Sequence, residues 1–150
     1  PLSSPIYDVV FLSRNGEKAG RFKNIKVFED LMSKANLSCK ILDWHDWSKY
    51  VPKGVATPSY GDFNLPNFRI DAANRILSLG KIVLSDRMHA IILGMLMGKH
   101  VVALDNIYDK FKRLHDTFLS NYTSTELNLD FANSYEEAVE KIQKSIHNIV

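Results

Sequence analysis

The feature that most constrains the fold is an alternation between short apolar runs and segments with helical spacing. Four runs are rich in β-branched and aromatic residues: IYDVVFL (6–12), CKILDW (39–44), KIVLSD (81–86) and HVVALD (100–105). Runs of this length and composition are typical of buried strands. Strands that alternate with helices form a parallel sheet with right-handed crossovers. The pattern therefore predicts an α/β fold of the doubly wound, Rossmann-like class, with a mainly parallel sheet and helices on both faces.

The segments between the runs carry helical patterns. Apolar side chains recur at three- and four-residue intervals in residues 24–35. Residues 67–79 lie between Pro66 and Gly80, and a glycine at this place is a common helix stop. Helices are therefore predicted over both segments, with Gly80 ending the second.

The final segment and one central stretch have different patterns. Residues 134–149 open with Ser134 and Glu137, a capping-box pair, and then present one apolar face. We expect an amphipathic closing helix there. Residues 46–66 hold three prolines, two glycines and several aromatic side chains without clear periodicity. This stretch is predicted to be a long loop or an irregular crossover.

Length and charge narrow the class of protein. The 150 residues fit one domain, and 19 basic against 17 acidic residues leave a formal charge of +2. Such a balance favours neither nucleic acid nor an anionic membrane as the main partner. The single Cys39 offers no disulfide and no metal-ligand spacing, and the longest apolar run, 90–97, is too short to span a membrane. We expect a soluble, cytoplasmic protein without a metal, and the start at Pro1 suggests a fragment.

Charged and titratable residues stand directly before an apolar helical stretch in SDRMHAIILGMLMGKHVVALDN (85–106). If 81–84 is a strand, Ser85, Asp86 and Arg87 lie where open α/β sheets bind ligands. The free N–H groups of a helix N-terminus favour an anion there, and Arg87 adds a forked cation. His89 can exchange a proton near neutral pH. Each residue also has a structural alternative, with Asp86 as an N-cap, Arg87 on the surface and His89 in the core.

The helix that follows is apolar on nearly every side. A helix of this kind is expected to be buried. Gly94 and Gly98 lie four residues apart, which would let a neighbouring element approach closely. A glycine inside a helix costs about 1 kcal/mol relative to alanine, so Gly94 indicates a packing demand.

The stretch resembles the most distinctive region of the polysaccharide pyruvyl transferase family. In that family a Thr/Ser-Asp-Arg-Leu-His run opens a buried helix, and a Val-rich strand ending in Asp and a Tyr-Gly-Lys element follow. This chain has SDRMH at 85–89, with Met88 in place of leucine, and YDK at 108–110, with Asp109 in place of glycine. The resemblance therefore rests on a run of residues with chemical roles and on its order along the chain.

Two further positions bear on the resemblance. Residues 8–20, DVVFLSRNGEKAG, are similar to a family strand that ends in arginine and precedes acidic residues, so Arg14 and Glu17 correspond. His100 stands where the family often has proline. The resemblance spans most of the chain.

The resemblance implies an architecture and an activity. The family has two domains arranged as in glycosyltransferase-B enzymes, and residues 1–150 would be a single Rossmann-like domain, the C-terminal one, with the N-terminal domain missing. Its members transfer pyruvate from phosphoenolpyruvate to a pair of sugar hydroxyls as a ketal. Such reactions serve exopolysaccharide or cell-surface glycan biosynthesis. Phosphoenolpyruvate is the donor substrate, a sugar or glycan is the acceptor, and no metal or further cofactor is implied.

The resemblance also implies roles for individual residues. His89 would be the general acid or base, and Arg87 would be catalytic as well. The phosphate and carboxylate of phosphoenolpyruvate would be bound by cations and a hydroxyl: Arg14, Arg87, Lys110 and Ser85.

Two other classes of function remain open. A nucleotide-sugar glycosyltransferase domain would bind a diphosphate at the same edge of the sheet. A non-catalytic Rossmann-like module would bind a ligand or a partner protein there.

Overall fold

Strands and helices alternate along the chain, as the sequence pattern predicts. The computed structural model describes residues 4–13, 22–51, 54, 56, 61–62, 65–105 and 110–149. The elements are β1 (Tyr7–Ser13), α1 (Ile25–Lys34), β2 (Cys39–Asp43), a 3₁₀ helix (Trp44–Tyr50), α2 (Leu65–Ser78), β3 (Gly80–Ser85), α3 (Met88–Leu96), β4 (His100–Leu104), α4 (Lys110–Leu114), a π-helical segment (His115–Leu119), α5 (Ser124–Leu127), β5 (Leu129–Ala132) and α6 (Tyr135–Ile146).

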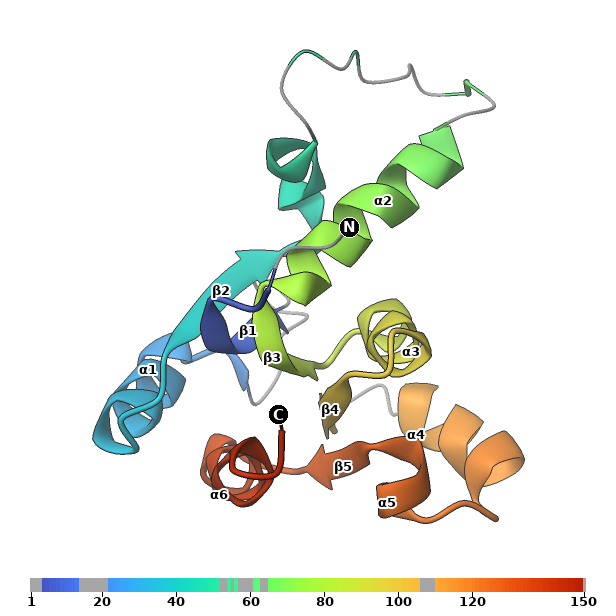
Figure 1. Cartoon of the computed structure of the whole chain (residues 1–150). Coiled ribbons are helices and arrows are strands. Elements are labelled where there is room, and N and C mark those ends of the chain that lie inside the picture. Colours follow the sequence, from blue (N-terminus) through green and yellow to red (C-terminus); the bar gives the residue numbers. More distant parts are fainter. Residues whose placement is uncertain are drawn as a thin grey trace.

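The strands form one parallel sheet in the order β2-β1-β3-β4-β5. Val10 of β1 pairs with Lys40 on one side and with Val83 on the other, so β1 is an interior strand, as are β3 and β4. Helices α1 and α6 lie on one side of the sheet, and α2 and α3 lie on the other (Figure 1). The predicted doubly wound, Rossmann-like α/β fold is confirmed.

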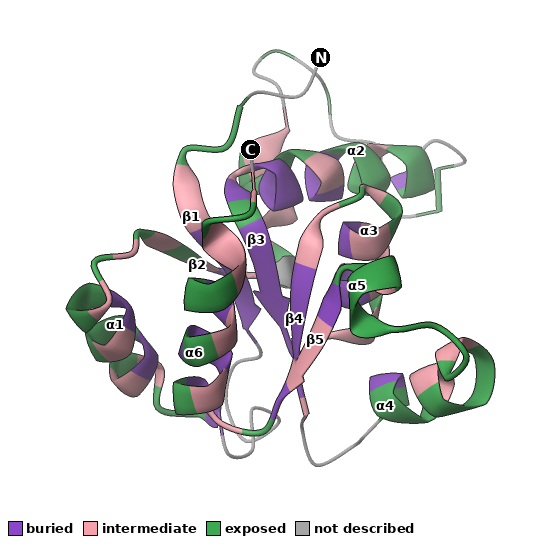
Figure 2. Ribbon diagram, turned by 60° about the horizontal axis from the view of Figure 1, so that its bottom comes forward, coloured by how far each residue is buried: buried purple, intermediate pink, exposed green. Residues whose placement is uncertain are grey.

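Each face of the sheet has its own core, because successive strand side chains point to opposite faces. In β1, Val9 and Phe11 join the core beneath α1 and α6, and Val10 and Leu12 join the core beneath α2 and α3. Buried residues run along β3 and β4 in the middle of the sheet (Figure 2). Burial on both faces explains why these strands read as continuous apolar runs.

The second predicted helix differs from the structure at both ends. Helix α2 begins at Leu65, so Pro66 lies within its first turn, where the missing N–H of proline costs nothing. Gly80 is not a helix stop but the first residue of β3. A Cβ atom at Gly80 would lie 2.4 Å from the backbone nitrogen of Val10. The glycine is therefore required by the close approach of β1.

The C-terminal part contains a strand that the sequence pattern did not predict. Strand β5 pairs with β4, with Val101 opposite Leu129. The predicted closing helix is confirmed as α6, and the Ser134 hydroxyl accepts a hydrogen bond from the N–H of Glu137 at 3.1 Å. The Glu137 carboxylate accepts from the N–H of Asn133 at 2.8 Å, one residue before the position that the capping box predicts.

Helix α3 is only partly buried, although its sequence is apolar nearly all round. Ala90, Ile91 and Gly94 face the sheet, and Leu96 is 78% exposed. A Cβ atom at Gly94 would meet a side-chain methyl of Val101 at 3.0 Å, which confirms the packing demand at that position. Gly98 has a different role, because its φ of +71° ends the helix. No helix in the described part of the chain is both long and apolar enough to cross a bilayer.

Candidate functional site

The strand order creates a switch point at the carboxyl edge of the sheet. The chain passes from β1 outward to β2 and then crosses to β3 on the other side of β1. In open α/β sheets, ligands bind outside the carboxyl ends of the strands at such a point. Ser13 ends β1, Asp43 ends β2 and Ser85 ends β3, so three polar residues meet there.

Ser85 fixes the backbone at the start of α3. Its side chain is fully buried, and its hydroxyl donates to the carbonyl of Leu12 at 2.8 Å. The same oxygen accepts a hydrogen bond from the N–H of Arg87 at 3.0 Å. In this position Ser85 ties β3 to β1 and orients Arg87.

The Arg87 side chain crosses the ends of two neighbouring strands. Its Nε donates to the carbonyl of Ser13 at 3.3 Å, and one terminal nitrogen lies 3.4 Å from Oδ1 of Asp43. The side chain is 23% exposed, so the guanidinium is held at the surface of the switch point. A guanidinium has five N–H donors, and the contacts among the described residues engage two of them. The others can bind an anion.

Asp43 is a site residue that the sequence analysis did not single out. Its side chain is 12% exposed, and its Oδ1 accepts a hydrogen bond from the backbone N–H of His45 at 2.9 Å while facing Arg87. The signal was its place as the final carboxylate of a predicted strand. Parallel strands end at a common edge, so this position could have been paired with Arg87 once the strand order was known.

The N-terminus of α3 lies beside the guanidinium. Arg87 occupies the N-cap position, its own side chain makes no capping hydrogen bond, and the first helical bond runs from Ile91 to the carbonyl of Arg87. The N–H groups of residues 88–90 therefore have no partner within the helix and carry the positive end of its dipole. The alternative that Asp86 is the N-cap is wrong. Asp86 is buried, and burial together with the Asp86 carboxylate raises the pKa of Tyr135.

The other residues singled out from the sequence lie in different places. His89 is exposed on the first turn of α3, so the alternative of a core histidine is wrong. Lys110 is exposed at the start of α4, which follows β4 along the chain, and no described hydrogen bond or ion pair joins it to Arg87. Arg14, Glu17 and Tyr108 lie outside the described residues. The structure therefore brings Ser85 and Arg87 together and leaves His89 accessible beside them.

A metal site would need several ligand side chains close together among the described residues. Within them, no three histidine, cysteine, aspartate or glutamate side chains are grouped as metal ligands would be. The described charged residues at the carboxyl edge include Arg87 and three aspartates, Asp43, Asp86 and Asp105. The arrangement is suited to holding an anion against Arg87 and the helix N-terminus.

Comparison with known protein sequences identifies the family of this chain. The sequence profile of the family described as polysaccharide pyruvyl transferase matches residues 5–108. The curated protein "Pyruvyl transferase 1" of Schizosaccharomyces pombe is 29% identical over 124 residues, which cover 81% of this chain and 30% of that protein. The chain thus spans less than a third of the length of this relative. No solved structure matches this chain. Because the family profile covers more than half of its length, the chain belongs to the polysaccharide pyruvyl transferase family.

Proposed function

We propose that this chain is part of a cytoplasmic enzyme that transfers pyruvate from phosphoenolpyruvate to two hydroxyls of a sugar as a cyclic ketal. The product would belong to an exopolysaccharide or a cell-surface glycan. Membership of the family supports the proposal, as does the name of the Schizosaccharomyces pombe relative. The chain covers 30% of that relative, which is consistent with a longer enzyme whose N-terminal domain supplies the rest of the acceptor site.

The reaction sets the requirements of the site. The methylene carbon of phosphoenolpyruvate gains a proton, and the adjacent carbon forms bonds to two sugar oxygens as its bond to the phosphate oxygen breaks. Of the two hydroxyl protons released, one balances the proton added to the methylene carbon and the other leaves with phosphate. The site must therefore hold two anionic groups and deliver one proton.

The position of Arg87 is the single observation that carries the proposal. Its guanidinium lies at the switch point of the sheet, next to the N-terminus of α3. An anionic group of the donor can bind both at once. Lys110 and Arg14 would hold the second anionic group, and buried Ser85 would keep Arg87 in place.

His89 is our candidate for the proton transfer. It lies two residues after Arg87, on the first turn of the same helix, and its side chain is exposed. An imidazole in this place can protonate the methylene carbon or accept a hydroxyl proton. A general acid or base of this kind contributes about 10²- to 10⁴-fold to the rate.

Substitution of Arg87 and His89 tests the proposal in the longer protein that would contain this chain. Phosphate release from phosphoenolpyruvate is measured with a glycan acceptor. Arg87→Ala should lower kcat/KM by about 10²- to 10³-fold, as expected for a donor to a developing anion. His89→Gln should lower kcat and leave the KM for phosphoenolpyruvate nearly unchanged. The matched controls are exposed residues elsewhere, Arg75→Ala on α2 and His147→Gln after α6.

The same experiment can reject the proposal. If Arg87→Ala and His89→Gln both keep the activity of their controls, the catalytic assignment is wrong. A non-catalytic module would show no phosphate release in any form.

A nucleotide-sugar transferase is the alternative that the same geometry permits, because a diphosphate also fits a helix N-terminus. Thermal-shift measurements with phosphoenolpyruvate and with uridine or guanosine diphosphate sugars separate the two. Stabilisation by phosphoenolpyruvate, abolished by Arg87→Ala, supports pyruvyl transfer. Stabilisation by the nucleotide sugars alone supports the alternative.

A further inference from the structure

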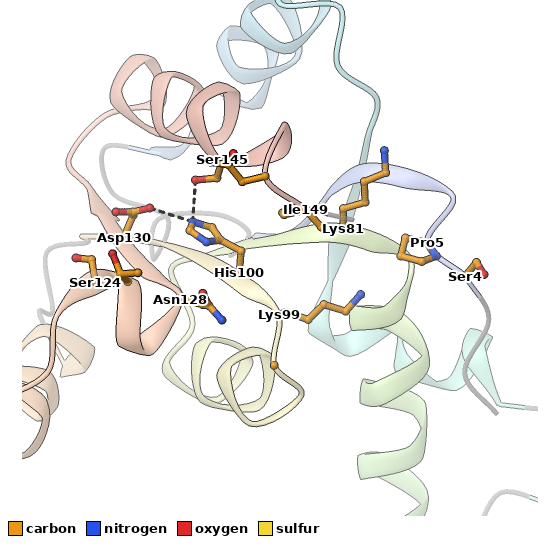
Figure 3. A pocket seen from close by; sticks show the side chains of 13 residues that line it. Ser4, Pro5, Lys81, Lys99, His100, Ser124, Asn128, Asp130, Ser145 and Ile149 are labelled. Carbon is orange, nitrogen blue, oxygen red and sulfur yellow. Dashed lines mark hydrogen bonds and ion pairs between the residues drawn. The ribbon is translucent and has the colours of Figure 1, made fainter.

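A polar pocket lies at the opposite edge of the sheet from Arg87. It has a volume of about 800 Å³ and opens at the amino ends of β3, β4 and β5 (Figure 3). The segment before β1, the turn before β4, helix α5 and the end of α6 complete its wall. The six residues of β3 separate the two edges by roughly 20 Å, at about 3.3 Å per residue. The pocket is therefore distinct from the site at the carboxyl edge.

Three polar side chains from three elements meet on one wall of the pocket. Nε2 of His100 on β4 lies 2.9 Å from Oδ2 of Asp130 on β5 and 3.1 Å from the hydroxyl of Ser145 on α6. The Asp130 and Ser145 side chains thus meet at the same nitrogen of the His100 imidazole (Figure 3). A carboxylate beside a ring nitrogen favours a proton on that nitrogen, so Nε2–H points to Asp130 and Ser145 together.

This geometry favours binding rather than nucleophilic catalysis. A serine nucleophile needs the carboxylate on one imidazole nitrogen and the hydroxyl on the other. Here both use Nε2, so His100 cannot take a proton from Ser145 while Asp130 holds the ring. The Ser145 proton, the second Asp130 oxygen and Nδ1 of His100 have no partner in the contacts of the described residues. These groups are a donor and acceptors that a hydroxyl-rich ligand can satisfy.

Positive charge lies on the other side of the pocket. Lys99 lies across from Asp130 and Ser124 (Figure 3). Lys81 lines the same side, but its side chain points away from Lys99 and its Nζ lies 3.0 Å from Oδ1 of Asp8. Lys99 donates to the carbonyl of Gly80 at 2.8 Å, which leaves two of its three N–H donors for a ligand. Burial lowers the pKa of Lys99, and a bound anion would favour its charged form. The pocket thus has a cationic side and a hydrogen-bonding side.

Asn128 presents a side-chain amide to the same pocket. Its backbone is left-handed, with φ +50° and ψ +42°, and its carbonyl accepts from the N–H of Val101 at 2.8 Å. The backbone of Asn128 is therefore bonded to the sheet, while its side-chain amide offers both a donor and an acceptor to the pocket. Glycine adopts this conformation without strain, so the side chain can be removed without disturbing the turn.

We propose that this pocket binds a monosaccharide that carries an anionic group, either a sugar acid or a sugar phosphate. The anionic group contacts Lys99, and the ring hydroxyls contact Asp130, Asn128 and Ser145. The volume lies within the range of ligand pockets, about 300–1,000 Å³. The proposal does not depend on pyruvyl transfer, because it concerns the other edge of the sheet.

The test is an NMR titration of the ¹⁵N-labelled chain with four probes: glucuronate, glucose 6-phosphate, glucose and acetate. We expect the charged sugars to shift the backbone amides of Lys99, His100 and Asp130, and to bind more tightly than glucose or acetate. Asn128→Gly should weaken the binding of the charged sugars by roughly threefold to tenfold, as expected for the loss of one hydrogen bond. Asn36→Gly is the matched control, because Asn36 also has a left-handed backbone, with φ +55°, but lies outside the pocket.

A second variant tests the cationic side. Lys99→Met should remove the preference for the charged sugars over glucose, whereas Lys34→Met, at the end of α1, should leave it unchanged. The proposal is overturned if the charged sugars do not shift amides at this edge, or if acetate shifts them equally. It is also overturned if Asn128→Gly, with an otherwise native spectrum, binds as the wild type does. None of these measurements uses phosphoenolpyruvate, so their outcome is independent of the test of the proposed function.

Discussion

The ion pair between Arg87 and Asp43 should couple the ends of β3 and β2 energetically. The two groups lie 3.4 Å apart, with side chains 23% and 12% exposed. At an effective dielectric constant near 20, charges at this distance attract by about 5 kcal/mol, and the desolvation of both groups offsets most of this attraction. We therefore expect a net coupling of about 1–2 kcal/mol, above the usual value for an exposed pair.

A double-mutant cycle measures this coupling directly. Arg87→Met keeps the aliphatic part of the side chain, and Asp43→Asn keeps an oxygen that can accept from the N–H of His45. Free energies of unfolding are obtained by urea denaturation for the wild type, both single variants and the double variant. Arg87→Met alone should cost about 2–3 kcal/mol, because it removes a cation from beside a largely buried carboxylate. The double variant should be less destabilised than the sum of the two.

The control is a second cycle on Lys81 and Asp8, a pair at 3.0 Å whose side chains are 44% and 21% exposed. Its coupling should be smaller despite the shorter distance, because solvent screens it more strongly. If the Arg87 and Asp43 effects add within about 0.3 kcal/mol, Asp43 does not hold the guanidinium and the reasoning on the site geometry fails.

Two further predictions concern the packing that supports this edge. Gly80→Ala would place a Cβ atom 2.4 Å from the backbone nitrogen of Val10, so the strands must separate and the chain should lose about 3 kcal/mol or more of stability in urea. Tyr135→Phe removes a buried hydrogen bond of 2.5 Å to the carbonyl of Phe22 and should cost about 1–2 kcal/mol. Burial, with the Asp86 carboxylate, raises the pKa of Tyr135, so the unfolded chain loses this proton first, at about pH 10. The resulting stability is complete below that pH and falls as the pH rises above it, a decline that Tyr135→Phe should lack.

Each of these predictions has a comparison that can contradict it. Gly98→Ala strains the backbone at φ +71°, but its Cβ atom would contact no other group, so it should cost only about 1 kcal/mol of stability. If Gly80→Ala costs no more than this, the predicted clash with β1 is refuted. For Tyr135, a stability curve that falls equally above pH 10 in wild type and variant would assign the decline to other groups.

The sheet was predictable where strands are buried on both faces. The runs that form β1, β3 and β4 contact helices on both faces of the sheet, so nearly every position along them favours an apolar residue. Strand β5 gave no such signal, because it has four residues and only its first and last are buried. Gly80 was misread for a related reason: the sequence shows that a glycine ends a helical pattern, but the neighbouring strand that requires it is 70 residues away, at Val10.

The carboxyl-edge site was predictable to the extent that its groups are consecutive in sequence. Ser85 and Arg87 follow a strand and open a helix, so chain order alone places them at one edge. Asp43 comes from a strand on the far side of β1, and only the order β2-β1-β3 brings it to Arg87. The sequence therefore predicts which residues stand at strand ends, and the topology decides which of them meet.

The amino-edge pocket shows the opposite case. Lys99 and His100 are adjacent in sequence, but Asn128, Asp130 and Ser145 come from three later elements and carry no motif with them. His100 was visible only as a residue standing where the family often has proline. A proline there would have neither the imidazole that joins β4 to β5 and α6 nor a backbone N–H, whereas the histidine provides both. If the pocket binds an anionic sugar, this one departure from the family pattern supplies the group on which the polar side of the pocket is built.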